Sequence, residues 1–183
     1  MQKKARIINY YQYTNRMADA KKMIPFIRKW EGGYVNDPDD AGGCTMMGVT
    51  IKVFQKYYGA DKTCDDLKHI TEDEWLSIFK KGYWDYCKAD KIENQSIAEL
   101  VVDMAWVSGP VNAIKRVQRA LNLKDDGIVG PNTLKALNGE KKAVFEQLWN
   151  MRKKWLEDIA QKKNNRKYLK GWLNRLNDIR YED

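Results

Sequence analysis

The stretch KWEGGYVNDPDDAGGCTMMGVT, residues 29–50, decides the architecture because it lacks the helical repeat of apolar residues seen on either side of it. The pairs Asp37-Pro38 and Gly42-Gly43 are typical of tight turns, and short segments around them can extend as strands. We therefore expect residues 33–50 to form a turn-rich β-hairpin, the one candidate for β structure in the chain.

The segment that leads into this stretch has the pattern of an amphipathic helix. From Asp19 onward, apolar residues recur at helical spacing: Met23, Phe26, Ile27 and Trp30. The pair Gly32-Gly33 is expected to end the helix in a left-handed cap. This prediction places Glu31 in the last helical turn, directly before the hairpin.

The rest of the chain reads as helical. Residues 71–84 begin with Thr71 as N-cap and Glu74 three positions later, which is a capping box. Residues 96–109 are apolar nearly all round, as in a buried central helix, and Pro110 and Pro131 each suit the first turn of a following helix. We also expect helices at residues 51–59 and 167–179. A further long helix is expected to have one apolar face, made of Val144, Leu148, Met151, Trp155 and Ile159.

These patterns predict a mainly α protein with a small β-hairpin lobe. We expect residues 1–16 to be an N-terminal extension, residues 17–97 to form the part that carries the hairpin, and residues 98–183 to form a helical C-terminal part. The two larger parts are expected to pack as one unit, since 183 residues suffice for a single core.

Composition limits the classes of function. The chain is 43% hydrophobic with seven tryptophans, and no apolar run approaches the roughly 20 residues that span a bilayer. The net charge of +8 favours polyanionic partners, namely nucleic acid, anionic membrane or acidic cell-wall polymers. Much of the excess lies in residues 141–183, where a solvated helical face is the simplest interpretation. No recognition-helix pattern supports nucleic acid, so we expect no nucleic-acid partner.

Neither a metal nor a disulfide is expected. A calcium loop that began at Asp37 would need a glutamate at position 48, which is Gly48. Cys44, Cys64 and Cys87 are odd in number and lack metal-site spacing, so they are expected to be reduced thiols. The N-terminal residues show no secretory signal, which predicts synthesis in the cytoplasm without a signal peptide.

The carboxylates of the opening stretch suggest acid–base chemistry. Glu31 would feel the negative end of its helix dipole, and Tyr34 could exclude water from it, so its protonated form is favoured. Asp40, in a polar loop nine positions later, should stay ionised. Two carboxylates in different environments are what glycoside hydrolysis requires, and Thr45 could hold a water. Composition alone favours a simpler interpretation, in which Glu31 is a surface residue at a helix end without a catalytic role and the aspartates form turns.

The order of these residues favours the catalytic interpretation over the structural one. EGGYVNDPDDAGGCTMMGVT resembles the signature of glycoside hydrolase family 108, bacterial and phage N-acetylmuramidases once called secretion activator proteins, and more distantly the Glu, Asp, Thr order of phage-type lysozymes. Residues 83–84, 101–137 and 167–176 resemble later blocks of that family, including its peptidoglycan-binding region. The resemblance runs from about residue 20 to residue 180.

The resemblance implies a lysozyme-like fold and cleavage of the β-1,4 bond between N-acetylmuramic acid and N-acetylglucosamine. By this carry-over Glu31 is the acid and Asp40 the base, with Thr45 beside it; Asp37 is the next candidate for the second carboxylate, and inversion is expected by analogy. Further substrate contacts are expected from Asp37 and from rings that can stack on sugars: Tyr34, Trp84 and Trp106.

Partners follow from the same resemblance. The expected partner is the peptidoglycan glycan strand, reached by a monomer without a cofactor after passage through a holin or another secretion route. The alternative from another class is a peptidoglycan-binding or secretion-associated protein that keeps the fold with little catalysis. A basic, helical nucleic-acid binder is the second alternative, and it predicts a steep salt dependence of DNA affinity.

Overall fold

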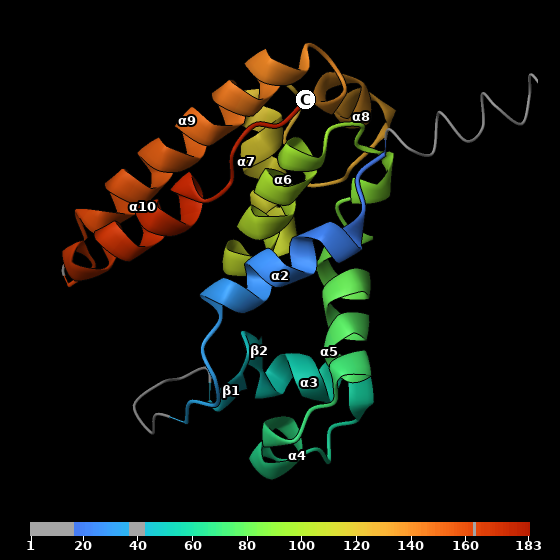
Figure 1. The fold of residues 1–183 in the computed structure, drawn as a ribbon, viewed down its shortest axis with the longest axis vertical. Helices are drawn as coiled ribbons and strands as arrows, with labels where there is room; N and C mark the ends of the chain where they lie inside the picture. Colours follow the sequence, from blue (N-terminus) through green and yellow to red (C-terminus); the bar gives the residue numbers. More distant parts are fainter. Residues whose placement is uncertain (1–16, 37–42, 163) are drawn as a thin grey trace, which may run out of the picture. The chain divides into compact units, whose positions relative to one another are not determined.

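The computed structural model describes residues 17–36, 43–162 and 164–183, which belong to two compact units (Figure 1). Unit 1 contains residues 17–20 and 84–183, and unit 2 contains residues 21–83. The division of the chain after residue 97 stays a prediction. Within the described residues, none of the helices combines the length and the apolar character needed to cross a membrane.

Unit 2 is built around a short hairpin flanked by helices. Its elements in chain order are α2 (Ala20–Trp30), β1 (Thr45–Met46), β2 (Val49–Thr50), α3 (Ile51–Tyr58), α4 (Cys64–Lys68), α5 (Glu72–Phe79) and the π-helical turn η1 (Lys80–Trp84). The strands pair antiparallel, with Thr45 opposite Thr50 and Met46 opposite Val49. Met47 and Gly48 between them both have positive φ, of 45° and 76°, as a tight two-residue hairpin requires.

The helix before the hairpin forms as predicted, but its end differs. Met23 and Ile27 are buried on one face of α2, and the Glu31 N–H donates to the Ile27 carbonyl at 3.1 Å. The prediction of a left-handed cap at Gly32-Gly33 is wrong, because neither glycine has a positive φ. The chain instead runs on to Val35, which forms an isolated antiparallel bridge with Thr45.

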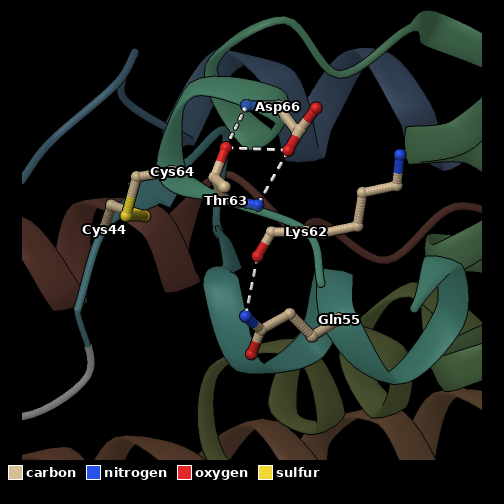
Figure 2. Close-up of a disulfide and its surroundings, with 6 residues drawn as sticks. All are labelled: Cys44, Gln55, Lys62, Thr63, Cys64 and Asp66. Atoms are coloured by element: carbon tan, nitrogen blue, oxygen red, sulfur yellow. Dashed lines mark hydrogen bonds between the residues drawn. A yellow bond between two sulfur atoms is a disulfide. The ribbon is translucent and has the colours of Figure 1, made fainter. Parts of the chain in front are cut away.

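The expectation of three reduced thiols is also wrong. Cys44, directly before β1, and Cys64, the first residue of α4, form a disulfide with their Cα atoms 5.9 Å apart (Figure 2). The two cysteines are 20 positions apart in the sequence, so local spacing gives no sign that they pair. Cys87 is the remaining thiol, and it is buried.

Capping boxes begin two helices of unit 2. The one predicted at Thr71 is present, with the Glu74 carboxylate accepting from the Thr71 N–H at 2.9 Å. A second box at Thr63 and Asp66 begins α4 beside the disulfide (Figure 2). Each box satisfies backbone N–H groups that a helix start would otherwise leave without partners.

Unit 1 surrounds the apolar helix predicted near its centre. Its helical elements in chain order are η2 (Ala89–Lys91), α6 (Gln95–Ser108), α7 (Pro110–Ala120), α8 (Pro131–Leu137), α9 (Lys141–Ala160), η3 (Arg166–Tyr168) and α10 (Leu169–Asn177). Nine residues of α6 are buried, and it packs against α7 and α9. Figure 1 shows α10 lying alongside α9.

The helix boundaries in unit 1 follow the glycines and prolines. Gly109, with φ of 80°, separates α6 from α7, and Pro110 occupies the first turn of α7. Pro131 does the same for α8. The predicted breaks at these positions are therefore confirmed.

The buried face of α9 is rotated from the predicted one. Val144 and Leu148 are buried as expected, but Arg152 and Leu156 occupy the core further along, while the other three predicted residues are half-buried. The cause is Asp103, fully buried in α6, with which Arg152 forms an ion pair. Arg175 of α10 pairs with the same carboxylate at 2.8 Å. One buried carboxylate thus links three helices of unit 1.

Candidate functional site

Glu31 lines a pocket of about 390 Å³ in unit 2. The pocket is formed by the C-terminal end of α2, the hairpin and the start of α5, through Arg28, Glu31, Gly32, Gly33, Met46, Met47 and Glu72. Apart from the adjoining residues of the chain, no atom of the described residues lies within 4 Å of where a Cβ would stand on Gly32 or Gly33. The two glycines therefore leave the backbone beside Glu31 open to a ligand.

One indole holds the walls of this pocket together. Trp75 of α5 is fully buried, and its Nε1–H donates to the carbonyl of Met47 in the hairpin turn at 2.9 Å. The Arg28 guanidinium of α2 lies 5.3 Å from the centre of the Trp75 ring. Trp75 thus contacts both other walls of the pocket, the hairpin turn through Met47 and α2 through Arg28.

An ion pair joins two walls of the same pocket. Arg28 Nη2 lies 3.2 Å from a carboxylate oxygen of Glu72, the first residue of α5. Both side chains are more than one-third exposed, so the pair adds little to the free energy of unfolding. Its main effect is to hold the two charged groups beside the pocket. The pocket therefore contains one cation and two carboxyl groups, those of Glu31 and Glu72.

Tyr83 is electrostatically coupled to Glu31. Burial raises the pKa of the Tyr83 phenol above its usual value, and the neighbouring Tyr57 and the negative charge of Glu31 raise it further. Tyr83 lies in η1, and π-helical turns of this kind are frequent at functional sites. A Cβ on Gly82 would stand 2.8 Å from the Tyr57 hydroxyl, so a side chain at this position would require the Tyr57 ring to shift. Tyr83 therefore keeps its proton at neutral pH and is acted on by the charge of Glu31.

The other residues predicted for catalysis are only partly described. Thr45 lies in β1, half-buried, with its backbone bonded in both directions to Val35 at 2.8 Å. It precedes Met46 of the pocket wall but does not itself line the pocket. Asp37 and Asp40 lie outside the described residues, so their roles stay predictions.

The three aromatic residues predicted to bind sugars have different surroundings. Tyr34 is half-buried in unit 2, with the Lys68 Nζ 5.8 Å from its ring centre. Trp84 belongs to unit 1 and is 1% exposed, so it presents no ring face on which a sugar could stack. Trp106 is half-buried in α6 of unit 1. The burial of Trp84 makes it a core residue.

The sequence pattern gives no sign that Arg28, Glu72 and the hairpin methionines line the pocket, or that Tyr83 is coupled to Glu31. The capping box that begins at Thr71 located the start of α5 but gave no sign that Glu72 would reach the pocket. The pair Tyr83-Trp84 resembles a block of the family, but the expected substrate contact in it is Trp84 rather than Tyr83. Across residues 17–36, 43–162 and 164–183, no group of His, Cys, Asp and Glu side chains could hold a metal ion.

Comparisons with known proteins agree with this arrangement. Residues 24–109 match the family model described as glycosyl hydrolase 108, and residues 112–177 match the one described as a predicted peptidoglycan domain. The solved structure of Brucella abortus SagA is similar to this chain, with 28% identity and a TM-score of 0.76 over 87% of this chain and 90% of that one. Among curated proteins, none matches. The chain thus carries a region of the glycosyl hydrolase 108 family followed by a predicted peptidoglycan region, on a mainly α, lysozyme-like fold, and this pairing supports a peptidoglycan hydrolase.

Proposed function

We propose that this protein is a muramidase, which hydrolyses the β-1,4 bond between N-acetylmuramic acid and N-acetylglucosamine with Glu31 as general acid. The observation that carries the proposal is the position of Glu31. It follows α2 directly, lines an open pocket within the region that matches the glycosyl hydrolase family, and acts electrostatically on Tyr83. A carboxyl group in such a pocket can protonate the glycosidic oxygen of a bound strand.

Tyr83 supports the role of Glu31 as an acid. When Glu31 gives up its proton, negative charge develops on the carboxylate. The phenol of Tyr83 has a raised pKa and therefore keeps its own proton at neutral pH, so it can stabilise that charge as a neutral donor. Arg28 lies in the same pocket wall, where its ion pair with Glu72 balances its charge.

The second carboxylate is assigned to Asp40, with Asp37 next and Thr45 beside it, as the resemblance implies. Glu72 is a further candidate because it lines the same pocket as Glu31. The ion pair between Glu72 and Arg28 favours a structural role for Glu72, because its carboxylate is already paired with a cation. Comparing Asp40→Asn, Asp37→Asn and Glu72→Gln separates these assignments: we expect the first to lose the most activity and the last the least. Inversion of the anomeric centre is the proposed outcome.

The test of the acid is release of reducing ends from purified peptidoglycan by the wild type and by Glu31→Gln. We expect the variant to lose at least about a hundredfold in rate, because a general acid contributes roughly that much or more. Asp73→Asn is the matched control, since Asp73 is exposed in the same unit and lies outside the pocket. Far-ultraviolet circular dichroism should show the same helical content in all three proteins.

Two results would contradict the proposal. If folded Glu31→Gln retains the rate of the wild type, another residue is the acid. If the folded wild type binds peptidoglycan but releases no reducing ends at any pH, the binding-protein alternative replaces the muramidase, and the predicted peptidoglycan domain would account for the binding.

We further propose that the protein acts as a monomer on the cell wall, after release through a holin or another secretion route. The Cys44–Cys64 disulfide supports action outside the cytoplasm, since structural disulfides persist mainly in oxidising compartments. Labelling of free thiols in protein recovered from the cytoplasm and from the medium tests this. Reactive Cys44 and Cys64 in the secreted fraction would contradict it.

A further inference from the structure

A groove of about 420 Å³ lies on unit 1, well separated in sequence from Glu31. It runs between α7 and α9, which pack against each other. Its lining combines three cations, one carboxylate and an apolar floor: Arg116, Arg119 and Ala120 from α7, and Met151, Lys154, Trp155 and Asp158 from α9. All seven residues fall inside the segment that matches the predicted peptidoglycan domain.

Arg116 is held in place before any ligand arrives. Its guanidinium carbon lies 4.4 Å from the centre of the Trp155 ring, and its Nη1 donates to the Ser108 Oγ at 3.2 Å. A stacked and hydrogen-bonded guanidinium loses little further freedom when it binds an anion. The groove therefore has a pre-positioned fork for a carboxylate.

The charges of the groove leave an excess of positive potential. Burial lowers the pKa of Arg116, and the positive charge of Arg119 lowers it further, so the two cations repel each other. Arg119 Nε forms a close ion pair with an Asp125 oxygen at 2.8 Å. The pair between Lys154 Nζ and an Asp158 oxygen one helical turn away is longer, at 3.8 Å. An anion bound at Arg116 would relieve this repulsion, and Lys154 in the same groove can contact the same anion.

We propose that this groove binds the stem peptide of peptidoglycan, with Arg116 and Lys154 on a peptide carboxylate and Met151 and Trp155 against its small apolar side chains. The inference rests on the proposed function, which identifies the polymer as peptidoglycan. It adds that the groove recognises the peptide part of that polymer. Stem peptides combine carboxylates with alanine methyl groups, which matches cations placed over an apolar floor. Duplex DNA offers phosphates but few apolar groups to Met151 and Trp155, so the lining favours the peptide.

The experiment measures binding of a soluble disaccharide–tetrapeptide by calorimetry with the full chain. This fragment lacks the bond that a muramidase cleaves, so binding is measured without turnover. The same disaccharide without its peptide, and the tetrapeptide form with amidated carboxylates, are the comparison ligands. We expect each comparison ligand to bind at least about tenfold more weakly, because hydrogen bonds between charged partners are worth that much or more.

Variants test the residues. Arg116→Gln combined with Lys154→Gln should weaken binding of the disaccharide–tetrapeptide about tenfold or more. The matched control, Lys135→Gln combined with Lys142→Gln, removes the same charge from exposed positions in the same unit and should change binding less than about twofold. Lys154→Glu is a second test that spares the fold, since its side chain is 78% exposed, and it should weaken binding further.

The outcomes separate this inference from the muramidase proposal. If the wild type cleaves peptidoglycan but binds all three ligands equally, or if the groove variant binds like the wild type, the groove inference is overturned while the muramidase stands. If the wild type releases no reducing ends yet binds the peptide form through Arg116 and Lys154, the groove stands and the muramidase falls. Loss of DNA binding in the groove variant, with unchanged binding of the peptide form, would assign the groove to nucleic acid and overturn the proposal.

Discussion

Tyr83 and Cys87 show how burial changes two side chains four positions apart. Burial raises the pKa of both groups, and for Cys87 it does so to about 12. In Tyr83 the charge of Glu31 acts in the same direction. Both groups therefore keep their protons at neutral pH, but only the tyrosine is coupled to the carboxyl group of the site.

Changing Tyr83 to phenylalanine tests its role beside Glu31. We expect the rate of reducing-end release to fall about tenfold, because the proposed stabilisation of the Glu31 charge by a neutral hydroxyl is worth roughly 1.5 kcal/mol or more. Since the pKa of Tyr83 is raised, the wild-type phenol stays neutral below pH 10, so the loss should be the same across the neutral range. Tyr58→Phe is the control, because its hydroxyl donates to the Glu74 carbonyl instead. Equal losses in both variants would show a general effect on folding.

The pKa of Cys87, raised to about 12, predicts an unreactive thiol. At pH 8 the folded, oxidised protein should show no rapid reaction with a thiol reagent, because the thiolate is the reactive form. Unfolding in denaturant should expose one thiol, and reduction should raise the count to three, as the disulfide and the free cysteine require. A fast-reacting thiol in the folded protein would contradict the buried position.

At the scale of elements, local patterns and long-range contacts set different features. The capping box at Thr71, the break at Gly109 and the prolines that begin α7 and α8 are local, and the sequence predicted each of them. The rotation of α9 depends on Asp103, which lies 49 positions before Arg152 and leaves no sign in the pattern of α9. A helical repeat shows which residues share a face but not what packs against it.

Asp103 is expected to be essential for the stability of unit 1. Asp103→Asn leaves Arg152 buried without a counter-charge, and removing one partner of a buried pair costs about 3–5 kcal/mol in the free energy of unfolding. Arg175 would lose its ion pair with Asp103 as well. Urea unfolding followed by circular dichroism measures the change.

Glu157→Gln is the control for this comparison. Its oxygen lies 4.0 Å from Lys153, and both side chains are about half exposed, so the expected change is below about 0.5 kcal/mol. If Asp103→Asn cost no more than the control, the three-helix ion network would have no part in stability.

At the scale of the whole molecule, the Glu31 pocket and the groove lie in different units. Unit 2 carries Glu31, its pocket and the disulfide, while unit 1 carries the groove between α7 and α9. The disulfide ties the start of β1, next to the pocket wall, to α4. Reduction should therefore affect the two units differently.

Reduction of Cys44–Cys64 is expected to lower the free energy of unfolding of unit 2 by about 3 kcal/mol, as the chain-entropy estimate gives for a loop of this size. Hydrolysis should fall at temperatures where the reduced unit opens, whereas binding of the disaccharide–tetrapeptide by unit 1 should stay within about twofold. Cys44→Ser combined with Cys64→Ser repeats the test without reductant. Equal losses of hydrolysis and binding would show that the units do not act independently.

The sequence by itself determined the mainly helical fold, the presence of a hairpin within residues 33–50, the helix breaks at Gly109, Pro110 and Pro131 and the place of Glu31 next to the end of α2, because turns, caps and apolar repeats act within a few residues of one another. Only the tertiary structure decided that Cys44 pairs with Cys64, that Trp84 and Arg152 are buried, and that Arg28, Glu72 and Tyr83 surround or act on Glu31. These features depend on residues far apart in the chain, and their energies come from burial and charge that exist only once the elements have packed together.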